Sequence, residues 1–193
     1  MMKKASLLAI TALAALSAQA QTTEKYIGSD VRLLSKDIVL SNISSSHAAV
    51  KLRQKSEGRR LDVIVDQAFL SSEWTAYSFT FTPAASGTIN IECRGTKDAP
   101  ATQYVAYDTI SAQGAVLRNG GFEEFAEGKP NPKFWWGEFK PEQVLKDPEQ
   151  AQSGTTFAVS RHDKPFRTNF KVTANQPVTI TYFIKRVMLE AAE

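Results

Sequence analysis

The stretch that decides the fold runs from residue 77 to residue 91 and reads YSFTFTPAASGTINI. Apolar residues alternate with Ser and Thr in residues 77–82, and residues 88–93 (TINIEC) alternate in the same way. In a β-strand successive side chains point to opposite faces, so a period of two places every second side chain in a core. Pro, Ser and Gly in residues 83–87 are turn residues. The stretch predicts two strands joined by a turn.

The same alternation recurs on both sides of this stretch. It is present in residues 61–65 (LDVIV), 105–107 (VAY) and 178–184 (VTITYFI). Helical periodicity is weak, since the best candidate, residues 141–152, is interrupted by Pro148 and predicts one short turn or a loop. Short strands separated by Gly and Pro turns are typical of a β-sandwich or barrel. We therefore expect an all-β fold.

Residues 1–20 have the features of a cleavable secretory signal peptide. Lys3 and Lys4 precede an apolar stretch, and Ala18 and Ala20 are the small residues that a signal peptidase prefers. The apolar run is shorter than the roughly 20 residues needed to cross a bilayer. We expect cleavage, no membrane span, and a soluble product secreted to the periplasm or the extracellular space.

Composition excludes several classes of protein. Removal of residues 1–20 leaves 173 of the 193 residues, which suits one domain of ordinary size. The signal contains two of the 23 basic residues, so 21 basic and 20 acidic residues remain. With no Lys/Arg stripe, nucleic acid is not an expected partner. Cys93 is the only cysteine, so an internal disulfide is impossible and stability must come from the core.

Residues 117–124 read LRNGGFEE, and GKP at residues 128–130 and Trp136 follow. This order resembles the opening of jelly-roll carbohydrate-binding modules of the galactose-binding-like superfamily, which begin with an Asn-Gly-x-Phe-Glu strand, a Gly-x-Pro loop and a tryptophan. Residues 153–182 are similar to the strands that follow in that family. The resemblance implies a jelly-roll β-sandwich that binds a glycan or polysaccharide.

Residues 73–110 look like the closing strands of the same module, although here they come first. Two interpretations follow: one circularly permuted domain over residues 21–193, with residues 111–118 as the new connection, or two partial modules, 21–114 and 115–193. Half a sandwich would leave sheet faces bare and edge strands unpaired, which favours the single domain. Exchange of halves between two chains is a variant of it.

The resemblance also implies a structural calcium ion between the opening and closing strands. The matching ligands are Glu123, the backbone carbonyl of Asn119, and Asp108. Calcium takes about six to eight oxygen ligands, which carboxylates and carbonyls supply. The acidic pair common in the family is reduced here to Asp108-Thr109, and the alternative is that these are ordinary strand-end carboxylates.

A sugar site needs a flat aromatic face with polar groups around it. Phe134, Trp135 and Trp136 supply aromatic rings, and adjacent strand residues point to opposite sides. Trp136 matches the packed tryptophan of the family, which leaves Trp135 as the predicted stacking platform; alternatively, Trp135 covers the end of the sandwich. The predicted polar partners are Tyr104, Arg161, His162 and Arg167.

Catalytic patterns are weak. Ser160, His162 and Asp163 could form a triad on paper, but neighbours this close in sequence seldom meet in triad geometry. Glu123 and Glu124 would face opposite sides of a strand, so they do not form a carboxylate pair across a cleft. We expect a non-catalytic carbohydrate-binding module. The competing hypotheses are a cell-envelope or surface structural domain that binds another protein, and a small hydrolase.

Overall fold

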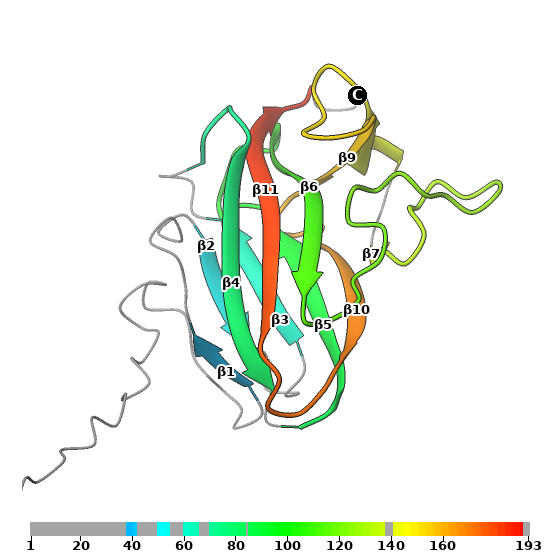
Figure 1. Cartoon of the computed structure of the whole chain (residues 1–193). Coiled ribbons are helices and arrows are strands. Elements are labelled where there is room, and N and C mark those ends of the chain that lie inside the picture. Colours follow the sequence, from blue (N-terminus) through cyan, green and yellow to red (C-terminus); the bar gives the residue numbers. More distant parts are fainter. Residues whose placement is uncertain are drawn as a thin grey trace, which may run out of the picture.

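Two β-sheets packed face to face form the body of the molecule (Figure 1). This computed structural model describes residues 38–41, 50–54, 60–65, 70–83, 85–137 and 141–190, so the predicted signal at residues 1–20 lies outside the described residues. The six-stranded sheet has the order β1 (Ile38–Ser41), β4 (Thr75–Pro83), β11 (Val178–Met188), β6 (Gln103–Gln113), β9 (Thr156–Ser160) and β8 (Val144–Lys146). The five-stranded sheet has the order β2 (Val50–Gln54), β3 (Arg60–Val65), β5 (Gly87–Arg94), β10 (Phe166–Val172) and β7 (Trp136–Gly137).

Helical structure within the described ranges is limited to the short 3-10 turn η5 (Pro141–Gln143). The turn falls where residues 141–152 predicted one short turn or a loop. In the part of the chain that the structure describes, no helix has the length and apolar character needed to span a bilayer. The all-β expectation is confirmed for these residues.

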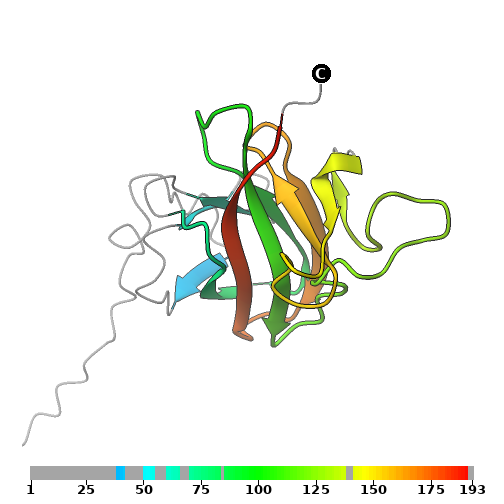
Figure 2. The same cartoon turned by 90° about the horizontal axis from the view of Figure 1, so that it is seen from above.

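The strands interleave the early and late parts of the chain. β11 lies between β4 and β6 and pairs antiparallel with both, as the red ribbon in Figures 1 and 2 shows. β10 pairs antiparallel with β5, and β3 pairs parallel with β5. The strand order is compatible with a jelly roll, and the two-sheet β-sandwich expected from the sequence is confirmed.

The core between the sheets contains aromatic rings from both parts of the chain. The ring of Tyr107 lies 6.4 Å from Tyr182 and 5.5 Å from Phe166, and Phe166 lies 5.6 Å from Phe122. All four residues belong to one buried cluster. The segments around Tyr107 and Phe122 therefore share a hydrophobic interior with the C-terminal strand.

The Asn-Gly-Gly-Phe-Glu segment, residues 119–123, is a turn, so the strand predicted there is wrong. Asn119 and Phe122 have φ angles of 53° and 61°, in the left-handed region. The carbonyl of Gly120 accepts a 2.9 Å hydrogen bond from the N–H of Ile110. A Cβ at Gly120 would lie 1.6 Å from the carbonyl oxygen of Ile110, so only glycine allows this approach to β6. We call residues 119–123 the anchored turn.

Candidate ligand groove on the five-stranded sheet

Strand β10 shows why the two faces of the five-stranded sheet differ. Phe166, Thr168 and Phe170 are buried towards the core, whereas the residues between them are at least partly exposed. Because side chains alternate along a strand, Arg167, Asn169 and Lys171 lie on the outer face. This face is polar and charged.

A groove of about 660 Å³ lies over this outer face. Its walls come from β5, β10, the residues after β6, and the segment that leads into β7. The lining residues are Thr88, Ala115, Val116, Arg118, Phe134, Trp136, Asn169, Phe170 and Lys171. Exposed aromatic and polar side chains therefore meet in one concave surface.

Two partly exposed aromatic side chains line the groove. Phe134 is 43% exposed and Trp136 is 37% exposed. Phe134 has a φ of 70°, a conformation that is costly for an aromatic residue. Its carbonyl accepts a 2.9 Å hydrogen bond from Thr168 Oγ1, and the guanidinium of Arg118 lies 5.1 Å from its ring centroid. These contacts hold the strained residue beside the groove.

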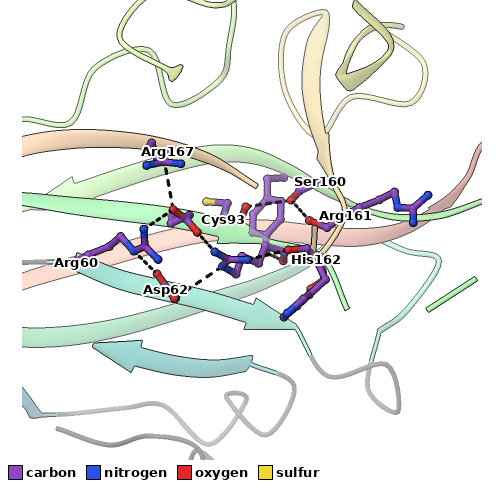
Figure 3. Close-up of polar contacts among 11 residues, drawn as sticks. Arg60, Asp62, Cys93, Ser160, Arg161, His162 and Arg167 are labelled. Carbon is purple, nitrogen blue, oxygen red and sulfur yellow. Dashed lines mark hydrogen bonds and ion pairs between the residues drawn. The ribbon is translucent and has the colours of Figure 1, made fainter. Parts of the chain in front are cut away.

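An ion network lies on the same face of the five-stranded sheet as the groove, and Figure 3 shows its polar contacts. Asp62 and Glu92 are fully buried, which requires that cations compensate their charges. Arg60 lies 2.8 Å from Asp62 and 3.0 Å from Glu92, and Arg94 contacts both carboxylates. Arg167 Nε lies 3.5 Å from Glu92 Oε2. The carboxylate of Glu92 therefore attracts the guanidinium of Arg167 on β10.

The orientation predicted for the two tryptophans is wrong. Trp135 is 4% exposed, lies 4.8 Å from the ring of Phe122, and donates its indole N–H to the Asn119 carbonyl at 2.8 Å. The two tryptophans do point to opposite sides, and the pairing of β7 with β10 determines which one faces the core and which one faces outwards. Trp136 is the register partner of outward-facing Arg167, so it lies on the outer face. Trp135 fills the core, and Trp136 faces the groove.

The other predicted ligand residues do not gather around either tryptophan. Tyr104 packs in a separate cluster on the six-stranded sheet, with the Arg161 guanidinium 6.0 Å from its ring. His162 Nδ1 lies 3.4 Å from the Gly95 carbonyl. Arg167 alone among the four polar residues lies beside Trp136. The structure therefore splits the predicted site among separate places.

The Ser160, His162 and Asp163 side chains do not form a Ser–His–Asp chain of hydrogen bonds. Ser160 Oγ donates to backbone carbonyls, including that of Cys93 at 3.0 Å (Figure 3). Asp163 pairs with Arg161 at 3.2 Å. The three side chains thus bind different partners.

Asp108, a predicted calcium ligand, holds the middle of the loop between β8 and β9. Its buried carboxylate accepts backbone N–H bonds from Gln152 at 2.9 Å and Ser153 at 3.2 Å, and one from Thr109 at 2.6 Å. Burial raises the pKa of Asp108 above its ordinary value of 3.8, although these hydrogen bonds act in the opposite direction. The carboxylate works as a fixed acceptor for the loop backbone.

Glu123, the second predicted ligand, holds the end of the same loop. Its Oε1 accepts backbone N–H bonds from Thr155 at 2.7 Å and Thr156 at 2.8 Å, and its Oε2 accepts both threonine hydroxyls. Partial burial would raise the pKa of Glu123, but these hydrogen bonds outweigh it, so the pKa lies below its ordinary value of 4.5. A Cβ at Gly154 would lie 2.3 Å from Glu123 Oε1, so the carboxylate and the loop are in close contact.

A calcium ion would need the same oxygens. Each oxygen of Asp108 and Glu123 accepts at least one N–H or O–H, and the Asn119 carbonyl accepts the Trp135 indole. In the part of the chain that the structure covers, no three His, Cys, Asp or Glu side chains gather as a metal-binding group. These residues as arranged do not fit a calcium ion, because N–H and O–H hydrogens already point at the oxygen atoms that would coordinate it. The ion stays a prediction from the resemblance.

Sequence reasoning missed most of the groove. The sequence indicates Phe134 only as part of the aromatic run 134–136, and it does not indicate Arg118, Asn169 or Lys171 as ligand residues. One usable signal existed for β10, because the alternation in FRTNFKV (Phe166–Val172) separates core residues from outward ones. The same alternation does not reveal which other segments lie beside it.

No family model, no curated protein and no solved structure matches this chain. The functional interpretation therefore depends on the geometry of the groove.

Proposed function

We propose that the protein is a secreted, non-catalytic module of jelly-roll type that binds a glycan or polysaccharide in this groove. The observation that carries the proposal is the placement of Phe134 and Trp136, both partly exposed, beside Asn169 and Lys171. The apolar face of a pyranose ring stacks against an aromatic ring, and nearby amide and ammonium groups hydrogen-bond the hydroxyls. The groove offers both kinds of contact.

The size and support of the groove agree with this role. Its volume of about 660 Å³ falls in the usual range for small-molecule sites, about 300–1,000 Å³. Thr88, Asn169 and Lys171 project from paired strands, and strands hold side chains more rigidly than loops do. A rigid surface reduces the entropy lost when an extended ligand binds.

The polar lining supports binding rather than bond cleavage. The charged side chains that line the groove, Arg118 and Lys171, are cationic, and the others that can hydrogen-bond are Thr88, Asn169 and the indole N–H of Trp136. Such groups orient a ligand through hydrogen bonds, whereas glycoside cleavage uses a pair of carboxyl groups.

One observation favours a second candidate, a surface domain that binds another protein. Val116 is 72% exposed at the edge of the groove, next to the partly exposed aromatic side chains. Exposed apolar side chains grouped in this way also suit a protein interface. The experiment below separates the two functions.

The test uses residues 21–193 on a glycan array, followed by titration calorimetry with the glycans that bind. We expect saturable binding that weakens about tenfold or more in Trp136→Ala, a loss of ~1.4 kcal/mol. Met188→Ala is the matched control, because Met188 is 59% exposed on β11 of the other sheet. Circular dichroism and the Tm of each variant establish that the fold persists.

Either of two results would reject the proposal. Folded wild-type protein that binds no glycan removes the function, and a stable homo-oligomer in light scattering would then favour the protein-binding domain. Glycan binding that survives Trp136→Ala unchanged removes the groove as the site.

A further inference from the structure

We infer that the groove selects an anionic polysaccharide, one whose sugar rings carry carboxylate or sulfate groups, and that Arg118, Lys171 and Arg167 bind those groups. The inference rests on the proposed function and specifies its ligand class.

The lining of the groove is positively charged. Arg118 and Lys171 line the groove, and both are exposed. The described lining residues include no Asp or Glu. The chain after residue 20 has 21 basic and 20 acidic residues, so overall charge does not account for this local excess. The groove is a positive region on a nearly neutral protein.

The positive region extends along β10. Arg167 is the register partner of Trp136, and Asn169, two residues further along the same face, lines the groove. The Arg167 side chain is 36% exposed and its Nε faces Glu92. A guanidinium whose Nε faces one anion has further N–H groups with which to bind a ligand.

The ion network that includes Arg167 has an excess of positive charge among its described members. Among its described members, three arginines (Arg60, Arg94 and Arg167) face two carboxylates (Asp62 and Glu92). Arg60 and Arg94 each contact both carboxylates, so the two positive charges of these arginines balance the two negative charges. The charge of Arg167, the most exposed of the three arginines, remains in excess on the sheet face over which the groove lies.

Arg118 also has a geometry that suits an anionic ligand. Its guanidinium lies over the ring of Phe134, 5.1 Å from the centroid. A guanidinium that contacts an aromatic ring through its face keeps N–H groups on its edge, which match the two oxygens of a carboxylate or sulfate. An acidic sugar stacked on Trp136 would therefore have cations on both sides of its ring substituents.

The test compares polymers that differ only in charge. Titration calorimetry uses polygalacturonate and polymannuronate, each against its carboxyl-reduced form, and dextran sulfate against dextran. We expect at least one acidic polymer to bind about tenfold tighter than its neutral partner, and its Kd to rise between about 50 and about 500 mM NaCl because salt screens exposed ion pairs. Polyglutamate, an anionic polymer without sugar, is expected to bind more weakly than that polymer.

Matched variants locate the effect. Lys171→Gln and Arg118→Gln are each expected to narrow the ratio of acidic to neutral affinity several-fold. Lys97→Gln is the control, because Lys97 is 72% exposed and its nearest charge partner is the adjacent Asp98, outside the groove lining. Tm values for all three variants exclude a change in folding.

The outcomes separate the two proposals. Equal affinity for acidic and neutral polymers overturns the inference and leaves the proposed function standing. Equal affinity for polyglutamate and the acidic polymers also overturns it, because charge alone would then explain binding. Binding to none of the sugars overturns both. Carboxylate-only and sulfate-only binding each support the inference and identify the anionic group.

Discussion

The anchored turn (residues 119–123) and the groove segment (residues 134–136) are the two ends of one loop excursion, and they face different environments. Phe122 of the turn is fully buried, whereas Phe134 and Trp136 of the groove segment are partly exposed. The loop between them projects from the sandwich (Figures 1 and 2). Its two ends are joined by Asn119, whose side-chain amide donates to the carbonyls of Glu124 and Lys133.

This difference shows that the residues that stabilise the turn and the residues that line the groove are mostly different ones. The residues that resemble the family motif, Asn119, Gly120, Phe122 and Glu123, hold the turn against β6, the core and the loop before β9. The residues that face the groove are mostly outside the motif. The motif therefore explains how the chain closes at this point, while ligand chemistry depends on the residues that alternate out of the core.

The largest expected effect is at Gly120. Gly120→Ala places a Cβ 1.6 Å from the Ile110 carbonyl oxygen, and relief of that clash requires loss of the hydrogen bond between Ile110 and Gly120. We expect a loss of more than about 4 kcal/mol in the free energy of unfolding. The control is Gly121→Ala, whose Cβ would have its nearest neighbour at 3.8 Å, and urea unfolding compares the two. Similar stability in both variants would mean that the turn is not docked on β6.

The tryptophan pair gives the next largest effect. Trp135→Ala removes a ring packed against Phe122 and Phe166, so we expect a loss of about 3–5 kcal/mol. Trp136→Ala removes a partly exposed ring and is expected to cost about 1 kcal/mol or less. Chemical denaturation measures both values. A reversed order would restore the orientation predicted from the resemblance.

Glu123 tests whether hydrogen bonds hold the turn to its loop. Glu123→Gln removes the charge that receives four donors from Thr155 and Thr156, and we expect a loss of about 1–2 kcal/mol at neutral pH. Because the folded-state pKa of Glu123 is lowered, the stabilisation is complete above the ordinary value of 4.5 and is lost as the pH falls through the folded-state value.

The measurement is the difference in unfolding free energy between wild type and Glu123→Gln as a function of pH. Asp108 has a raised pKa and the opposite pH dependence, and the charge of Glu123 contributes to that rise. The comparison is therefore repeated in an Asp108→Asn background, where only Glu123 of the two carboxyl groups titrates. A difference that does not shrink on acidification would contradict the role given to the carboxylate.

The smallest expected effect is that of calcium removal. Because N–H and O–H donors already occupy the oxygens of Asp108 and Glu123, we expect the same Tm in calcium and in EDTA. Differential scanning calorimetry measures both. A clear rise in Tm with calcium would show that the loop rearranges around an ion, and the anchored turn would then be a metal site.

Alternation predicted most of the sandwich because it follows directly from the pleat. The rows in β4, β5 and β11 face the core as their patterns indicated. The prediction for Trp135 and Trp136 is wrong because β7 has two residues, too few for a pattern. The sides to which the two tryptophans point are set by pairing with Phe166 and Arg167 of a distant strand. The groove was not predictable, since its walls come from separate segments that only the sheet brings together.

The position of β11 has a consequence for how the molecule folds. β11 follows every other described strand in sequence, yet it lies inside the six-stranded sheet and joins β4 to β6. Before residues 178–188 are available, that sheet consists of two separate pieces with unsatisfied edges. Its assembly must wait until residues 178–188 have been synthesised and depends on contacts between distant residues. This dependence favours slow, all-or-none formation over growth from the N-terminus.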